Sequence, residues 1–163
     1  MIRTGIGFDI HRFAKGRRLV LGGVEIPHAK GLLGHSDADV LTHAVMDALL
    51  GAVADGDIGL HFPPGDPRWR GADSLDLLCR VVARVKARGG RIVNVDATVL
   101  AEEPKLAPHR AAMCRRLAEA MGIGADRVSV KATTMEGLGA VGRRQGVAAM
   151  AVAGVEIRRA RKV

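Results

Sequence analysis

Hydrophobic residues recur along this chain with two different periods, and the switch between them limits the folds that the chain can adopt. Between Arg91 and Leu100, apolar residues alternate with polar ones, which is the pattern of a half-buried strand. Between Asp73 and Arg88, apolar residues recur every three or four positions, which is the pattern of a helix with one buried stripe. The chain therefore predicts a fold that combines strands with helices.

Turn residues divide the rest of the chain into further elements. A hairpin is expected over 18–26, because Gly22 and Gly23 supply the positive φ that a tight turn requires. The other expected strands are 2–10, 128–133 and 147–157, the other helices are 40–54 and 108–121, and the expected loops are 56–71 and 135–146. The hairpin and the closing strand break a simple strand–helix alternation, so the predicted class is α/β with a mixed sheet.

The length of 163 residues predicts a single domain over 1–163. Hydrophobic residues make up 48% and charged residues 26%, a mixture that excludes the disordered class. Cys79 and Cys114 fall within helical patterns, without a second Cys or His at metal spacing. We expect both to be buried as small apolar side chains.

The charge balance favours an anionic partner. Lys and Arg number 25 against 17 Asp and Glu, a formal charge of +8, which suits a phosphorylated metabolite, nucleic acid or a membrane surface. Some of this charge lies in a closing basic run, expected to be a solvated tail: Arg158, Arg159, Arg161 and Lys162. Aromatic residues are only 2%, which argues against base stacking, so no nucleic-acid partner is expected. No stretch has the length of a signal peptide or a membrane span, which predicts a cytoplasmic protein without a membrane partner.

Three residues could bind one metal ion. Asp9 and His11 lie two positions apart on an expected strand, so their side chains point to the same face. His43, from the expected helix 40–54, would complete a set of one oxygen and two nitrogen ligands that suits zinc with one open position. Taken alone, the Asp-x-His spacing is more typical of hydrogen bonding within a turn.

Polar residues immediately before the helix of His43 favour a site there. His35, Ser36, Asp37 and Asp39 lie in a glycine-flanked loop, and helix starts bind anions. In the alternative interpretation Ser36 is the helix cap, Asp39 a first-turn acid and His35 an exposed loop residue. A cap can also bind phosphate, so the two roles of Ser36 are compatible.

Other loops carry weaker signals. Carboxylates between Asp55 and Pro63 could accept hydrogen bonds from sugar hydroxyls, or they could belong to an ordinary polar loop. Lys105 and Lys131 lie beside small residues that expose backbone amides to a ligand. Glu136 is a lone carboxylate in a basic, glycine-rich loop, compatible with a magnesium ligand beside phosphates or with a surface ion pair.

A series of ordered motifs resembles those of the 2-C-methyl-D-erythritol 2,4-cyclodiphosphate synthase family over nearly the whole chain. The motifs are Gly7-Phe8-Asp9-Ile10-His11, Gly31-Leu32-Leu33-Gly34-His35-Ser36-Asp37, His43, Gly56-Asp57-Ile58-Gly59, Phe62-Pro63, Gly71-Ala72-Asp73-Ser74, Asn94-Val95-Asp96, Pro104-Lys105 and Lys131-Ala132-Thr133-Thr134. The resemblance implies a metal-dependent phosphorus–oxygen lyase of non-mevalonate isoprenoid biosynthesis. Its substrate would be 4-diphosphocytidyl-2-C-methyl-D-erythritol 2-phosphate, whose 2-phosphate attacks the β-phosphate and expels CMP, so that no protein nucleophile is needed.

The resemblance also implies an architecture and two cofactors. The fold would be α+β-like, with a mixed four-stranded sheet and helices on one face, in a homotrimer whose sheets face a central cavity. Each active site would lie between subunits and hold one Zn²⁺ and one Mg²⁺ or Mn²⁺. Asp9, His11 and His43 would hold zinc, and Glu136 the second cation.

The same resemblance assigns residues to the reaction. His35, Thr134 and Glu136 would be catalytic. The substrate contacts would come from His35, Ser36, Asp57, Ile58 and Gly59 for the phosphate and erythritol unit, Ala101, Pro104, Lys105 and Leu106 for cytosine, Lys131, Ala132, Thr133 and Thr134 for the ribose and diphosphate, and Arg143.

The chain departs from the family pattern at a few positions. Pro64 stands where an Asp is common, which removes one expected hydroxyl contact. Ala140, Val141 and Gln145 differ from residues that line the family's central cavity. The resemblance therefore gives little support for binding of an isoprenoid diphosphate in that cavity. Two other functions stay compatible with the residues: a zinc phosphodiesterase that activates water, and a basic nucleic-acid-binding protein.

Overall fold

The computed structural model describes residues 1–157, and the closing basic run predicted to be a solvated tail lies outside the described residues. The strands are β1 (Ile2–Ala14), β2 (Leu19–Leu21), β3 (Val24–Ile26), β4 (Gly31–Leu32), β5 (Gly90–Leu100), β6 (Val128–Thr133) and β7 (Gly146–Ile157). The α-helices are α1 (Val40–Ala52), α2 (Ile58–His61), α3 (Ser74–Ala87), α4 (Arg110–Met121) and α5 (Gly139–Gly142), with 3-10 turns at Pro67–Trp69, Ala107–His109 and Ala125–Arg127.

Five strands form one mixed sheet in the order β4-β1-β7-β5-β6, while β2 and β3 form a separate hairpin. β7 pairs antiparallel with β1 and β5, and β5 pairs parallel with β6. The mixed sheet is confirmed, but the expected strand number of four was wrong. The fifth strand, β4, has two residues and pairs with the end of β1 at Phe13 and Ala14, and so short a strand has no readable period.

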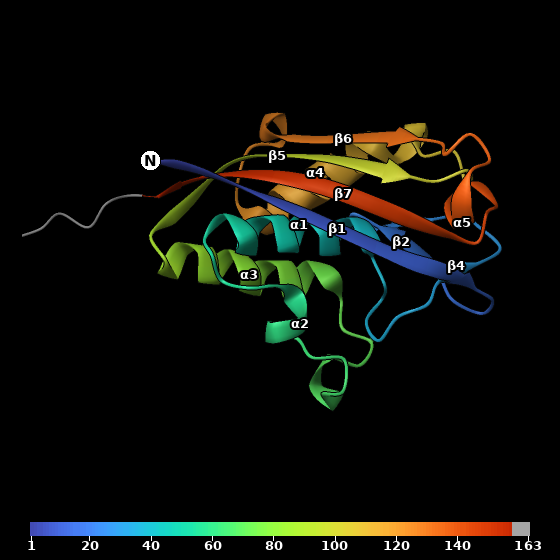
Figure 1. The fold of residues 1–163 in the computed structure, drawn as a ribbon, viewed down its shortest axis with the longest axis horizontal. Helices are drawn as coiled ribbons and strands as arrows, with labels where there is room; N and C mark the ends of the chain where they lie inside the picture. Colours follow the sequence, from blue (N-terminus) through green and yellow to red (C-terminus); the bar gives the residue numbers. More distant parts are fainter. Residues whose placement is uncertain (158–163) are drawn as a thin grey trace, which may run out of the picture.

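The long helices cover one face of the sheet, as expected (Figure 1). Two glycines let α1 lie directly against β1. A Cβ atom on Gly5 would stand 2.1 Å from the carbonyl oxygen of Ala48, and one on Gly7 would stand 2.0 Å from that of Ala44. Glycine inside a strand often marks such a close backbone approach. This contact brings His43 of α1 beside the strand that carries Asp9 and His11.

The other face of the sheet is uncovered in the single chain, and its part over β1 and β7 is apolar. Residues of even number on β1 point there, with Ile6 exposed to 65%, Phe8 to 54% and Ile10 to 49%. Met150 and Val152 of β7 extend the same surface, because they pair with Phe8 and Ile6. An exposed apolar surface of this kind is typical of a protein interface.

Several local expectations were wrong. The predicted loops 56–71 and 135–146 contain the short helices α2 and α5. Cys79 is exposed and Cys114 only partly buried. Cys79 misses the buried stripe of α3, which Leu78, Val81 and Val82 form with their neighbours, so its side chain lies outside the core. No helix within residues 1–157 is both long enough and apolar enough to cross a membrane.

Candidate metal centre and active site

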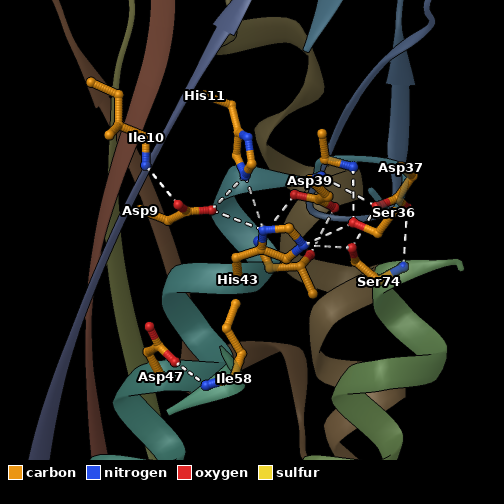
Figure 2. Close-up of polar contacts among 12 residues, drawn as sticks. Asp9, Ile10, His11, Ser36, Asp37, Asp39, His43, Asp47, Ile58 and Ser74 are labelled. Atoms are coloured by element: carbon orange, nitrogen blue, oxygen red, sulfur yellow. Dashed lines mark hydrogen bonds and ion pairs between the residues drawn. The ribbon is translucent and has the colours of Figure 1, made fainter. Parts of the chain in front are cut away.

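Asp9, His11 and His43 bring three ligand atoms to one point, as Figure 2 shows. Asp9 Oδ2 lies 3.0 Å from His11 Nε2 and 2.8 Å from His43 Nδ1, and the two nitrogens are 3.3 Å apart. A tetrahedral ion with bonds of about 2.0–2.1 Å separates its ligand atoms by about 3.3 Å. The donor set and its spacing therefore fit a small ion such as zinc after slight expansion.

Each histidine is held by a contact at its other ring nitrogen. His11 Nδ1 lies 2.7 Å from the carbonyl oxygen of Leu33, and His43 Nε2 lies 3.0 Å from Ser74 Oγ and 3.2 Å from Ser36 Oγ. The carbonyl can only accept, so His11 carries a proton on Nδ1, and loss of the Nε2 proton would leave the Nε2 lone pair for a metal. This arrangement of outer partners is usual for metal-binding histidines.

The electrostatics of the triad favour a charged pair. Burial by itself raises the pKa of Asp9, but hydrogen bonds from His11 and His43 outweigh burial and hold that pKa well below its ordinary value. Burial lowers the pKa of His11, and the hydrogen bond and charge of Asp9 outweigh this effect, so the pKa of His11 is raised. Without a metal, the triad therefore favours an Asp9 carboxylate beside a protonated His11.

The triad opens onto a pocket of about 230 Å³. Of the other residues predicted for the erythritol and phosphate contacts, His35, Ser36, Ile58 and Gly59 line this pocket, and Pro64 contributes to its wall. Asp57 caps the start of α2, where its carboxylate accepts a hydrogen bond from the amide of Leu60 at 2.9 Å. The chain thus brings the predicted zinc ligands and one predicted group of substrate contacts together.

The remaining predicted residues form a second group, and none of them lines that pocket. Ala101 and Thr133 are joined by a backbone hydrogen bond of 3.0 Å, at the ends of the neighbouring strands β5 and β6. Thr134 Oγ1 donates to Glu136 Oε1 at 2.5 Å, and Lys131 forms an ion pair with Asp96. The full second group is Ala101, Pro104, Lys105, Leu106, Lys131, Ala132, Thr133, Thr134 and Glu136.

Leu106 of the second group and Arg143, the remaining predicted contact, differ in how a ligand could reach them. Leu106 is buried in the core, so only its backbone could meet a ligand. Arg143 is exposed just after α5, and its guanidinium forms no hydrogen bond or ion pair with residues 1–157. Glu136 supplies a carboxylate that suits magnesium, which proteins usually hold through one or two carboxylates with substrate phosphates.

The helix start before His43 differs from the capping scheme considered for it. Asp39, not Ser36, is the N-cap of α1, and its carboxylate accepts hydrogen bonds from the Thr42 amide at 3.0 Å and from the amides of Gly22 and Gly23. Asp39 is fully buried, and burial raises its pKa. Asp39 occupies the cap, and the Ser36 hydroxyl at the pocket wall instead accepts the Ala38 amide at 3.1 Å and lies 3.2 Å from His43 Nε2.

Three residues of the site were not assigned a role from the sequence. Ser74 contacts His43 across 31 residues of sequence. Asp47 accepts the Ile58 amide at 2.8 Å and so fixes the start of α2. Glu102 accepts the Met135 amide at 2.8 Å and ties two loops of the second group together. Asp47 has a sequence signal, because it lies one helical turn after His43, whereas no local pattern relates the other two residues to their partners.

Comparison with known proteins gives consistent similarities over nearly the whole chain. A model of the YgbB family matches residues 2–156. The 2-C-methyl-D-erythritol 2,4-cyclodiphosphate synthase of Thermosynechococcus vestitus is 60% identical over 152 residues, which cover 93% of this chain and 94% of that protein. A solved 2C-methyl-D-erythritol-2,4-cyclodiphosphate synthase in a CDP-bound form is 42% identical with a TM-score of 0.86, and the match covers 94% of this chain and 100% of that one. The bifunctional IspDF from Campylobacter jejuni is 40% identical with a TM-score of 0.93, and the match covers 97% of this chain but 43% of that one.

Proposed function

We propose that this chain, which belongs to the YgbB family of 2-C-methyl-D-erythritol 2,4-cyclodiphosphate synthases, cyclises 4-diphosphocytidyl-2-C-methyl-D-erythritol 2-phosphate with release of CMP. Residues 1–163 would form one catalytic domain. The observation that carries the proposal is the convergence of Asp9, His11 and His43 at the mouth of a pocket.

Asp9, His11 and His43 would hold zinc, and Glu136 would hold magnesium or manganese. Bound there, the two cations supply Lewis-acid polarisation of phosphate oxygens and offset the charge of two approaching phosphate groups. The protein's own part is to keep His11 Nε2 and His43 Nδ1 pointed at one place, through the contacts of both rings with Leu33 and Ser74.

The other residues would orient a substrate that reacts with itself. His35 and Ser36 border the triad pocket and would meet the phosphates, while Asp57 and Gly59 would meet the erythritol hydroxyls. Such positioning is worth roughly 7 to 11 kcal/mol in well-oriented intramolecular reactions. The 2-phosphate forms a bond to the β-phosphorus as the bond to the CMP oxygen breaks, and CMP leaves with that electron pair.

We further propose that the active site is completed between subunits of a homotrimer whose sheets face a central cavity. Two features support this assembly: the second group of predicted residues does not line the triad pocket, and the part of the sheet face over β1 and β7, which carries Ile6 and Phe8, is apolar and uncovered. A neighbouring chain would then bring its Lys131, Thr134 and Glu136 to this chain's triad. Thr134, hydrogen-bonded to Glu136, would orient that carboxylate.

Product analysis tests the reaction. The purified protein, supplied with Zn²⁺ and Mg²⁺, should convert the substrate to CMP and a cyclic diphosphate in equal amounts, measured by phosphorus NMR and chromatography. A zinc phosphodiesterase with the same ligands would instead add water and yield a linear phosphate. A linear product, or no product from metal-loaded protein, would contradict the proposed cyclisation.

A further inference from the structure

We infer that Ser74 and Asp37 are positioning residues of the metal centre, linked to it by a hydrogen-bonded chain that runs from Asp37 through Ser74 to His43. The inference rests on the proposed function, because it assumes that His43 Nδ1 binds the metal. Figure 2 shows the chain of contacts on the side of the His43 ring that faces away from Asp9.

The contacts of Ser74 show which group donates in each of these hydrogen bonds. Ser74 Oγ lies 3.0 Å from His43 Nε2 and also makes a short hydrogen bond with Asp37 Oδ1. The carboxylate can only accept, so the hydroxyl hydrogen of Ser74 goes to Asp37. The lone pairs of Ser74 Oγ are then left to accept a hydrogen bond from the Nε2–H of His43.

This direction matches what a metal requires of His43. A neutral imidazole that binds a cation through Nδ1 carries its remaining proton on Nε2. Ser74 Oγ accepts a hydrogen bond from that Nε2–H and so stabilises the tautomer that leaves Nδ1 free for the metal. The charge of Asp37 polarises the Ser74 hydroxyl, so Ser74 Oγ is a better acceptor for the Nε2–H and holds the ring in place, as outer carboxylates do at other metal sites.

Burial strengthens the hydrogen bonds that link Asp37, Ser74 and His43. Ser74 is fully buried and His43 is 7% exposed, so water competes weakly for these hydrogen bonds. Ser36 Oγ is a second neighbour of His43 Nε2 at 3.2 Å, but it also accepts the Ala38 amide at 3.1 Å and has no carboxylate partner among residues 1–157. Ser74 is therefore the partner that connects the ring to a charge.

Asp37 also connects two segments of the polypeptide, one that leads into α1 and one that leads into α3. Its Oδ2 accepts the Ser74 amide at 3.0 Å, its Oδ1 accepts the Asp39 amide at 3.2 Å, and its own amide donates to the Ala72 carbonyl at 3.1 Å. One carboxylate thus joins the start of α3 to the N-cap of α1. Since α1 carries His43 and α3 carries Ser74, these bonds set the distance between the two side chains.

The test is zinc affinity, measured on the folded protein after removal and return of metal. Competition with a chromophoric chelator should show that Ser74→Ala binds zinc about 10- to 100-fold more weakly than the wild type, the usual loss for an outer partner of a metal ligand. Asp37→Asn keeps the Ser74 hydroxyl but removes the charge, and it should also weaken zinc binding. The visible spectrum of the cobalt-loaded Ser74→Ala protein should differ from that of the wild type, because the His43 ring is no longer held.

Asp73→Asn is the matched control. Asp73 is the N-cap of α3 and accepts the Leu75 amide at 2.8 Å, yet it does not contact His43. This variant should keep the zinc affinity and cobalt spectrum of the wild type. Wild-type affinity in Ser74→Ala, or equal losses in Ser74→Ala and Asp73→Asn, would overturn the inference. If Ser74→Ala fails to fold, the zinc affinity of Asp37→Asn is compared with those of the wild type and Asp73→Asn instead, and an unchanged affinity would overturn the inference.

The result is separable from the proposed reaction. A wild-type protein that binds zinc but releases no CMP would contradict the cyclisation and leave the role of Ser74 standing. A Ser74→Ala protein with wild-type zinc affinity would remove that role and leave the cyclisation untouched.

Discussion

Asp9 Oδ2 lies 2.8 Å from His43 Nδ1, although the two residues are 34 positions apart and belong to β1 and α1. With His11 they supply three ligands, the usual number for a catalytic zinc site. We therefore expect Asp9→Asn or His43→Ala to reduce bound zinc from about one equivalent per chain to a small fraction. Elemental analysis after dialysis measures this loss. His109→Ala, which removes a histidine far along the chain on the turn before α4, should retain the metal.

The pKa shifts of the triad predict how the metal-free protein responds to pH. The raised pKa of His11 adds stability that is complete below about pH 6.5 and is lost as the pH rises through the raised value. The lowered pKa of Asp9 adds stability that is present above about pH 3.9 and is lost as the pH falls. The difference in Tm between metal-free wild type and Asp9→Asn should thus be largest at about pH 4–6.5. A difference that stays the same at pH 5.5 and pH 8 would contradict this coupling.

Gly7→Ala should displace α1 from β1. The new Cβ would lie 2.0 Å from the Ala44 carbonyl oxygen and 2.7 Å from the Ala48 amide, and both are backbone atoms that cannot rotate away. Overpacking usually costs about 1–3 kcal/mol, and we expect the upper end of that range together with weaker zinc binding. Urea unfolding measures the loss. Gly65→Ala is the control, because a Cβ there meets no atom within 4 Å.

Period and residue type predicted the part of the site that depends on local geometry. Asp9 and His11 share a face because they are two apart on a strand, and this holds whatever the strand packs against. The helix of His43 was likewise legible in its apolar pattern, although it ends at Ala52, two residues earlier than expected. What these patterns do not contain is the distance between α1 and β1, which depends on tertiary packing at Gly5 and Gly7.

Contacts between distant segments explain the rest of the differences. Ser74 reaches His43 only because α3 packs beside α1, and Glu102 reaches Met135 only because β5 and β6 are neighbours. Asp39 was considered as a first-turn acid of α1, whereas in the structure it is the N-cap. Its carboxylate also accepts hydrogen bonds from the turn between β2 and β3, and that contact has no local sequence signal. Sequence periodicity reports which face a residue occupies and not which segment lies opposite.

Asp39→Ala should destabilise the fold more than removal of an exposed cap. The buried carboxylate of Asp39 accepts hydrogen bonds from the Gly22 amide at 2.9 Å, the Gly23 amide at 2.7 Å and the Thr42 hydroxyl at 2.7 Å, besides the Thr42 amide. A buried donor without a partner costs about 1–3 kcal/mol, so we expect the free energy of unfolding to fall by at least about 2 kcal/mol. Asp73→Ala removes the exposed cap of α3 and should cost about 1 kcal/mol. Equal losses in urea would mean that Asp39 acts only as a cap.

Ile6→Lys tests whether the uncovered sheet face assembles the enzyme. Ile6 is 65% exposed and pairs with Val152, so a lysine there is tolerated by the single chain but places a charge in the proposed trimer interface. Sedimentation should show a monomer that still binds zinc, since the triad lies within one chain, while CMP release falls by about 100-fold or more because the reacting groups lose their positioning. Ala83→Lys adds the same charge on the exposed face of α3 and should remain trimeric and active. A monomeric Ile6→Lys protein with full activity would show that one chain suffices, and the second group of residues would then need a role outside the reaction.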